Sequence, residues 1–306
     1  MEFGIDYLLR SQLATPANST QMIDDALESD ADQVFFDLED SLHASEKADA
    51  RASLVEAVRT REWGETPLSY RINSVRTRWW YEDVIEVVTA VGTEIESLIV
   101  PKVREPADLR TVETLLESVE TNAGLEPGGI DLLVQVEDAA GMGNVEEIVH
   151  ATDRLGAVIF GPGDYSASIE SKGHVLGADS DYPGHYWHYP LSRISHAAAS
   201  VDVPAIDGLY TNVEDVEGFR ESCRYARMLG FDGKWVIHPA QTAAANELFA
   251  PADEEVDRAR TVIETYETAA PGEVPTEDGR VVDEETVEMA RHILRKAELA
   301  GVDPSR

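Results

Sequence analysis

The chain contains little cysteine and no long hydrophobic segment, and both absences exclude classes of protein. Cys223 is the only cysteine among the 306 residues, so neither an internal disulfide nor a cysteine-bound metal cluster can form. No apolar run approaches the length that spans a membrane, and the N-terminal residues lack the pattern of a secretion signal. The sequence therefore predicts a cytoplasmic protein without a membrane partner.

Positive charge is the second shortage. The chain has 59 acidic residues against 25 basic ones, a formal net charge of −34, and only five of the basic residues are lysines. A nucleic-acid partner is not expected, because its phosphates would be repelled by such a surface. An acid-rich, lysine-poor composition is typical of halophilic proteins, since high salt screens the repulsion among acidic groups.

Strand-like runs alternate with amphipathic helical patterns along most of the chain. The first of these runs is not followed by the G-x-G-x-x-G pattern of a dinucleotide-binding sheet. The alternation predicts an α/β fold, a (β/α)8 TIM barrel formed by residues 1–250. The strands are expected at 7–14, 33–40, 67–73, 97–103, 131–138, 156–164, 203–208 and 234–239.

Two segments lie outside this repeat. A polar and aromatic insertion at 167–190 follows the sixth strand, and its length is typical of a lid or a subunit contact. Residues 251–306 predict a C-terminal helical extension that acts as a lid or in oligomerisation, with its last helix at roughly 284–299.

Each predicted strand ends on an ionisable residue. In a (β/α)8 barrel the carboxyl ends of the strands form the face that carries the active site. A carboxylate at the end of an apolar strand needs a cation, hydrogen bonds or water, so these side chains are expected to interact. They are Arg10, Glu39 with Asp40, Arg71, Lys102, Glu137, Asp164, Asp207 and His238.

Carboxylates without cysteine or paired histidines favour a hard divalent cation such as Mg²⁺. We predict Glu137 in "DLLVQVED" and Asp164 in "VIFGPGD" as its direct ligands. A carboxylate–arginine network without metal is the alternative. The backbone N–H groups of Gly163 and Asp164 are expected to bind a substrate carboxylate, and Lys102 is a further predicted substrate contact.

Along its whole length the sequence resembles the malyl-CoA and β-methylmalyl-CoA lyases of the citrate lyase β-subunit-like family. The ordered set is more specific than any single motif, and it includes "DLED" with a Lys-x-x-x-Arg downstream. The matching stretches are "RSQLATPAN" (10–18), "ADQVFFDLEDSLHASEKADAR" (31–51), "RIN" (71–73), "PKV" (101–103), "QVEDAAGMGNVEEI" (135–148), "FGPGDYSAS" (160–168), "AIDG" (205–208), "LGFDGKWVIHPAQ" (229–241) and "DGRVVDEETVEMA" (278–290).

The resemblance implies roles for the barrel residues. Glu137 and Asp164 match the metal ligands of the family, for Mg²⁺ with Mn²⁺ as a substitute. Glu39 and Asp40 match acidic groups that hold metal-bound water. Arg71 matches the arginine beside the reacting thioester carbonyl.

The resemblance also assigns Asp283, which the sequence alone would make a helix N-cap. It corresponds to a catalytic aspartate that moves a proton in the active site of a neighbouring subunit, within a homotrimer or homohexamer. Glu284 and Glu285 are expected to raise the pKa of Asp283. Arg10 and Trp235 are expected to contact CoA.

The implied reaction is the reversible cleavage of L-malyl-CoA or β-methylmalyl-CoA to glyoxylate plus acetyl-CoA or propionyl-CoA. Two alternatives remain open at this point. The same site can hydrolyse malyl-CoA to malate, which free CoA would reveal. A citrate lyase β-type subunit would instead need an acyl thioester bound to a carrier protein.

The net charge predicts that folding depends on salt. We expect the melting temperature to rise by several degrees or more between dilute buffer and molar KCl, because salt screens the acidic surface. Thermal unfolding followed by circular dichroism at both salt concentrations measures this. Equal melting temperatures would refute the prediction of a halophilic protein.

Overall fold

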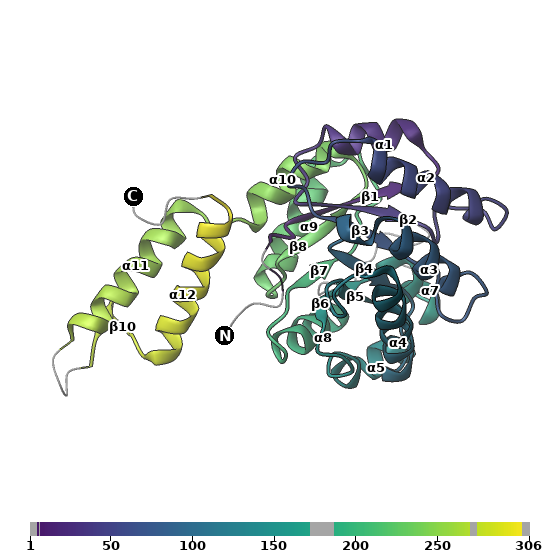
Figure 1. Cartoon of the computed structure of the whole chain (residues 1–306). Coiled ribbons are helices and arrows are strands. Elements are labelled where there is room, and N and C mark those ends of the chain that lie inside the picture. Colours follow the sequence, from purple (N-terminus) through teal and green to yellow (C-terminus); the bar gives the residue numbers. More distant parts are fainter. Residues whose placement is uncertain (1–4, 6, 172–186, 270–273, 302–306) are drawn as a thin grey trace. The chain divides into compact units, whose positions relative to one another are not determined.

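The structure, a computed structural model, describes residues 5, 7–171, 187–269 and 274–301. The chain divides into two compact units, Met1–Asn246 and Glu247–Arg306. The first unit contains a closed barrel of eight strands in sequential order, all pairing in parallel (Figure 1). The predicted (β/α)8 TIM barrel is therefore confirmed.

All eight predicted strands are present, with shifted ends. They are β1 (Ser11–Pro16), β2 (Gln33–Asp37), β3 (Leu68–Arg71), β4 (Ser97–Val100), β5 (Asp131–Val136), β6 (Leu155–Phe160), β7 (Ala205–Asp207) and β8 (Gly233–Val236).

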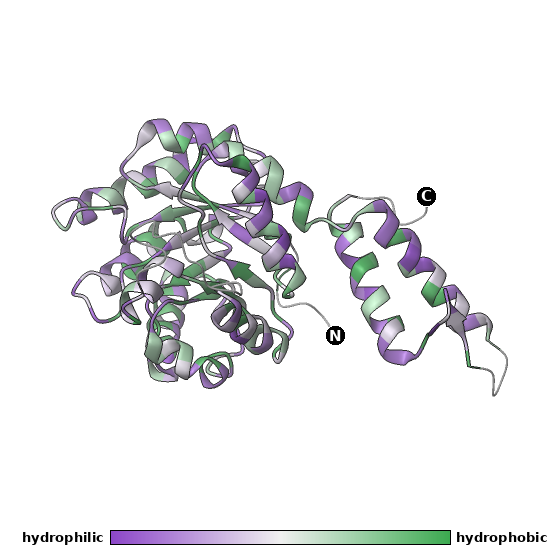
Figure 2. Ribbon diagram, turned by 180° about the vertical axis from the view of Figure 1, so that it is seen from behind, coloured by the Kyte–Doolittle hydropathy of each residue, from purple (hydrophilic) through white to green (hydrophobic). Residues whose placement is uncertain are grey.

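Helices follow the strands and surround the barrel (Figure 1). Figure 2 shows many hydrophilic residues on these outer helices. The helices are α1 (Thr20–Leu27), α2 (Lys47–Thr60), α3 (Trp80–Val91), the short 3-10 helix η1 (Gly92–Glu94), α4 (Pro106–Ala123), α5 (Ala139–Gly143), α6 (Val145–Ile148), α7 (Pro162–Ser168), α8 (His188–Ala199), α9 (Val216–Met228) and α10 (Pro239–Phe249).

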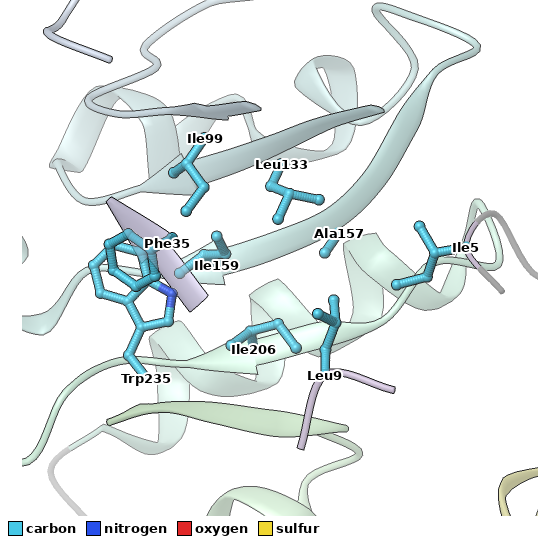
Figure 3. Close-up of a cluster of buried hydrophobic side chains, with 9 residues drawn as sticks. All are labelled: Ile5, Leu9, Phe35, Ile99, Leu133, Ala157, Ile159, Ile206 and Trp235. Atoms are coloured by element: carbon cyan, nitrogen blue, oxygen red, sulfur yellow. The ribbon is translucent and has the colours of Figure 1, made fainter. Parts of the chain in front are cut away.

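Side chains fill the interior of the barrel. Every residue of β2 and β3 is buried, because helices cover one face of each strand and the other strands cover the opposite face. Figure 3 shows the apolar cluster inside, where Phe35, Ile99 and Trp235 approach one another from different strands. The barrel is thus a packed core, and its chemistry is confined to the strand ends.

Several strands end earlier than the sequence suggested. β2 ends at Asp37, so Glu39 and Asp40 lie in the loop that follows it. Lys102 likewise follows β4, and Asp164 lies in the first turn of α7. These residues still lie beyond the carboxyl ends of their strands, where the fold places active sites.

The placement of Arg10 was wrong. β1 begins at Ser11, so Arg10 precedes the strand instead of ending it. Its guanidinium forms a bidentate pair with Asp32, which immediately precedes β2, at distances of 2.8 and 2.7 Å. Both residues therefore lie at the amino-terminal end of the barrel. The apolar run before Arg10 resembles a strand, but its Leu9 packs into the barrel interior. The predicted contact of Arg10 with CoA does not fit this position.

The second unit contains a helical hairpin. Its helices α11 (Asp253–Thr268) and α12 (Glu284–Leu299) run side by side in Figure 1. The short strands β9 (Thr276–Glu277) and β10 (Arg280–Val281) pair between them. Buried residues of both helices, such as Val262 and Ala290, form a separate small core. The unit begins at Glu247, four residues before the predicted start of the extension at 251, and its role as a lid stays a prediction.

The structure describes the predicted insertion at 167–190 and the helices only in part. Most of the predicted insertion, residues 172–186, lies outside the described residues. Among the helices that are described, none has the length and hydrophobicity needed to cross a bilayer.

Candidate active site

A buried ion pair occupies the carboxyl end of β2 and β3. The Arg71 Nε and Nη2 atoms donate to the two carboxylate oxygens of Asp37 at 2.8 and 2.7 Å. Burial alone would raise the pKa of Asp37, but the charge and hydrogen bonds of Arg71 lower that pKa to about 2. Burial also opposes the charge of Arg71, yet Asp37 and the nearby glutamates raise the pKa of the guanidinium. Both side chains are therefore charged, and the two hydrogen bonds hold the guanidinium in one orientation.

Trp235 supports this arginine from inside the barrel. The Arg71 guanidinium lies 5.2 Å from the centre of the Trp235 ring, within cation–π range. The indole N–H donates to the side-chain oxygen of Gln12 at 2.8 Å, and the ring packs 4.6 Å from Phe35. Only 2% of Trp235 is exposed. Trp235 belongs to the buried core (Figure 3), and its burial argues against the predicted contact with CoA.

Glu137 follows β5 and is held by two donors. Its Oε1 accepts the backbone N–H of Lys102 at 2.8 Å, and its Oε2 accepts the amide of Gln135 at 2.7 Å. A side chain at residue 161 would overlap Glu137, so the glycine found there is required for this packing. Burial, and then the charge of Glu39, raise the pKa of Glu137 well above its usual range. A cation bound next to Glu137 would therefore stabilise its charged form.

Lys102 joins the other acidic residues. Its ammonium lies 3.0 Å from Glu39 and 2.8 Å from Asp40, and 3.6 Å from the Oδ2 atom of Asp164. Burial raises the pKa of Glu39 to about 7, although Arg71 and Lys102 act in the opposite direction. The structure thus brings together the acidic and basic residues predicted for the site, namely Glu39, Asp40, Arg71, Lys102, Glu137 and Asp164.

The loop that carries Glu39 is held by a residue that sequence reasoning did not assign. The Lys47 ammonium donates to the carbonyl oxygens of Leu38 and Glu39 at 3.0 and 2.9 Å. It also lies 5.3 Å from the ring centre of Trp79. Lys47 is the lysine of the Lys-x-x-x-Arg pattern after "DLED". The pattern therefore pointed to this residue, but it did not indicate that the lysine binds the loop backbone.

Asp37 and Gln135 were also missed. Gln135 lies two residues before Glu137, on the same face of its strand, and its side-chain oxygen accepts from Arg71 at 3.3 Å. It therefore links the arginine to the predicted metal ligand. The alternation of side chains along a strand was the signal that could have found it.

Asp164 and Gly163 lie in the first turn of α7, with Pro162 at its start. A helix has no internal acceptor for its first N–H groups, so those of Gly163 and Asp164 point away from the following turns. Apart from its chain neighbours and the backbone of its own helix, no atom of the described residues lies within 4 Å of the place where a side chain of residue 163 would begin, which leaves space for a ligand there. The Asp164 side chain is 45% exposed. Their contact with a substrate carboxylate stays a prediction.

Two other strand-end residues have different partners. Asp207 forms a buried ion pair with Lys234. His238 is exposed, and its Nδ1 accepts the backbone N–H of Ala240 at 3.1 Å. Neither contact involves the acidic residues around Lys102.

Asp283 belongs to the second unit and is the N-cap of α12. Its Oδ1 atom accepts the backbone N–H of Thr286 at 2.9 Å and the Thr286 hydroxyl at 2.6 Å. These bonds lower the pKa of Asp283, so the expected rise caused by Glu284 and Glu285 is not found. The residue is exposed. Capping therefore leaves Asp283 an ionised carboxylate at the surface of its unit.

The donor set fits Mg²⁺. Within the described residues, no three His, Cys, Asp or Glu side chains are arranged to hold a metal by themselves. Mg²⁺ usually takes one or two carboxylates and completes its shell with water and substrate, which suits Glu137 and Asp164. The Oε2 atom of Glu39 is buried without a hydrogen bond, although the Arg71 Nη1 atom lies 3.4 Å away. A metal-bound water would satisfy that oxygen.

The chain is similar in sequence to known proteins over most of its length. Residues 10–239 match the family of HpcH/HpaI aldolases and citrate lyases. The chain belongs to this family. It is 36% identical over 303 residues to an L-malyl-CoA/β-methylmalyl-CoA lyase of Cereibacter sphaeroides, with 95% of both chains covered. It is 31% identical over 292 residues to the citrate lyase subunit β of Leuconostoc mesenteroides, covering 95% of this chain and 93% of that one.

A solved structure agrees with this assignment. The CitE protein of Mycobacterium tuberculosis, in complex with magnesium and pyruvate, superposes with a TM-score of 0.62 at 26% identity. The match covers 80% of this chain and 93% of that one. As a member of the HpcH/HpaI and citrate lyase family with these relatives, the enzyme is a carbon–carbon lyase.

The raised pKa of Glu39 predicts how the stability of this lyase depends on pH without metal. The folded state takes up a proton at a higher pH than the unfolded state does, about 7 against the ordinary value of 4.5. The contribution to stability is therefore greatest below pH 4.5 and falls as pH rises toward 7. In EDTA and molar KCl, the melting temperature of the wild type minus that of Glu39→Gln should fall across this range. A constant difference would contradict the raised pKa.

Proposed function

We propose that the enzyme reversibly cleaves L-malyl-CoA and β-methylmalyl-CoA to glyoxylate plus acetyl-CoA or propionyl-CoA. The observation that carries this proposal is the position of Arg71. Its guanidinium is fixed by Asp37 and Trp235, and it lies beside Glu39 and the Gln135 that holds Glu137. The named activity of the relative from Cereibacter sphaeroides supports the substrate class.

Glu137 and Asp164 would hold Mg²⁺, or Mn²⁺ in its place, with Glu39 and Asp40 binding its water molecules. When bound, the metal supplies Lewis-acid polarisation of the glyoxylate aldehyde and orients its carboxylate. The N–H groups of Gly163 and Asp164 would also bind that carboxylate. The magnesium named in the CitE complex supports this choice of ion.

Arg71 would stabilise the negative charge that develops on the thioester oxygen. Removing an α-proton from acetyl-CoA or propionyl-CoA gives an enolate, and a fixed cation lowers the barrier because it needs no reorganisation as the charge forms. The paired Asp37 keeps the guanidinium in one orientation, and the stacked Trp235 limits its movement. In the cleavage direction the carbon–carbon bond next to the thioester breaks to give glyoxylate, and the same cation would stabilise the thioester enolate that forms.

Asp283 would transfer the α-proton. Its lowered pKa keeps it ionised, which is the form that a base needs in the condensation direction. Since Asp283 belongs to the second unit, the role requires that unit to approach an active site, and we propose the active site of a neighbouring subunit in a homotrimer or homohexamer. Residues 251–306 would then serve as a lid for that neighbour.

Two other activities share these groups. Hydrolysis of malyl-CoA would use a water held beside the same thioester. The citrate lyase relative supports a second candidate, cleavage of a thioester bound to a carrier protein. Incubating the protein with metal, glyoxylate and acetyl-CoA or propionyl-CoA in molar KCl, and identifying the thioesters by mass, separates the three. Malyl thioesters indicate the lyase, release of free CoA indicates the hydrolase, and dependence on a carrier indicates the third.

Replacing Asp164 tests the metal site. Asp164→Asn should reduce metal-dependent turnover by at least about a hundredfold, because it removes one anionic ligand and little volume. Its melting temperature should stay close to that of the wild type, since the side chain is 45% exposed. Asp25→Asn, on the exposed surface of α1, removes the same charge and serves as control. Wild-type turnover in Asp164→Asn would disprove the ligand assignment.

Asp283→Ser separates capping from catalysis. Serine is nearly as good an N-cap as aspartate, so folding, assembly and metal binding should be retained. If Asp283 moves the proton, turnover should fall by about a hundredfold or more. If it is only a cap, turnover should be unchanged.

Mixing two inactive variants then tests which subunit supplies Asp283. After subunit exchange, some active sites would combine the wild-type Asp164 of one chain with the wild-type Asp283 of another. Mixtures of Asp283→Ser and Asp164→Asn should therefore regain activity. No recovery in proven mixed oligomers would place Asp283 within its own chain's site or outside catalysis.

A further inference from the structure

Lys102 is the cation that offsets the acidic residues of the site. Arg71 is committed to Asp37 by two short hydrogen bonds. The Lys102 ammonium instead binds Glu39 at 3.0 Å and both carboxylate oxygens of Asp40 at 2.8 and 3.0 Å. It also lies 3.6 Å from Asp164. One flexible side chain thus reaches three of the four carboxylates assigned to the metal and its water.

An ammonium and a divalent cation cannot both lie close to these oxygens without strong repulsion. Like charges repel in proportion to their product, and this repulsion is greater in the partly buried site than in water. Mg²⁺ also requires oxygens at about 2.0–2.1 Å in octahedral geometry, which leaves little freedom for a second cation on the same carboxylates.

We propose that Lys102 is a tethered counter-ion that competes with Mg²⁺ for Asp164, Glu39 and Asp40 and so weakens metal binding. In the metal-free protein the ammonium neutralises these carboxylates. When the metal binds, the ammonium withdraws toward solvent, where 28% of the Lys102 side chain is already exposed. The inference rests on the metal site of the proposed function and concerns how tightly that site binds.

The backbone of Lys102 has a separate task. Its φ of +54° lies in the left-handed region, which is unfavourable for a residue with a side chain. In this conformation its N–H donates to Glu137, the other predicted ligand, at 2.8 Å. A test of the ammonium must therefore keep the backbone. Methionine suits this purpose because it is unbranched like lysine and similar in size, and it carries no charge.

The test is the dissociation constant of Mg²⁺ for wild type and Lys102→Met, measured by isothermal titration calorimetry in molar KCl without thioester or glyoxylate. Removing the competing cation should tighten Mg²⁺ binding by about tenfold or more. Arg224→Met is the matched control, because it removes one positive charge from an exposed ion pair with Glu217. This control should bind Mg²⁺ like the wild type.

Unchanged or weaker binding in Lys102→Met would overturn the counter-ion role and leave the proposed function standing. Absence of metal binding in both proteins would overturn the metal site and this inference together. Activity plays no part in the measurement, so a wrong choice of substrate would not affect it.

A second measurement uses the wild type alone and holds even where Lys102→Met does not fold. Reductive methylation of lysines, read by peptide mass spectrometry, should label Lys102 several-fold faster when Mg²⁺ is saturating, because the ammonium has left its carboxylates. Lys234, buried against Asp207, should stay unlabelled and controls for unfolding. Slower or equal labelling of Lys102 with metal would contradict the proposal.

Discussion

The arrangement of the site depends on the buried carboxylate of Asp37. It accepts two hydrogen bonds from Arg71, and it also accepts the backbone N–H groups of Glu39 and Ser41 at 2.9 and 3.1 Å. One side chain therefore fixes both the cation of the site and the start of its acidic loop. Burying such a pair is expensive, and removing one partner would leave an unpaired charge in the core. The four bonds to Asp37 offset that expense.

Two buried glutamates of the site, Glu39 and Glu137, are compensated only in part by the nearby cations, and this makes the site suited to a metal. Glu39 and Glu137 are both buried, and their pKa values are raised despite the nearby Arg71 and Lys102. A folded protein tolerates such groups at functional positions, where an added ligand recovers the lost stability. A divalent cation bound beside these two glutamates would favour their charged forms.

The sequence predicted the barrel because each strand and helix has its own periodicity, and it predicted the acidic cluster because parallel strands end at one face. It failed where the direction or pairing of a side chain decides the role. Trp235 could be recognised as aromatic, but its packing beside Arg71 depends on a contact between distant strands. Arg10 was misplaced because the apolar residues before it, 7–9, resemble the start of a strand but precede β1. For Asp283 the sequence predicted the N-cap that the structure shows, whereas its catalytic role came from the family resemblance alone.

Charged residues have two roles in this protein, on its acidic surface and in the ion pairs of the barrel, and the lysines of the barrel belong to the second. Most charged residues of the chain are acidic residues or arginines, yet the barrel keeps Lys47, Lys102 and Lys234, each in contact with carbonyl or carboxylate oxygens. Salt screens exposed charges far more than buried ones. The acidic surface can therefore adapt to the surrounding salt, whereas the ion pairs inside must be balanced by the protein itself. Lysine is retained where a flexible point charge is needed next to oxygens, a task that the planar guanidinium of arginine performs less readily.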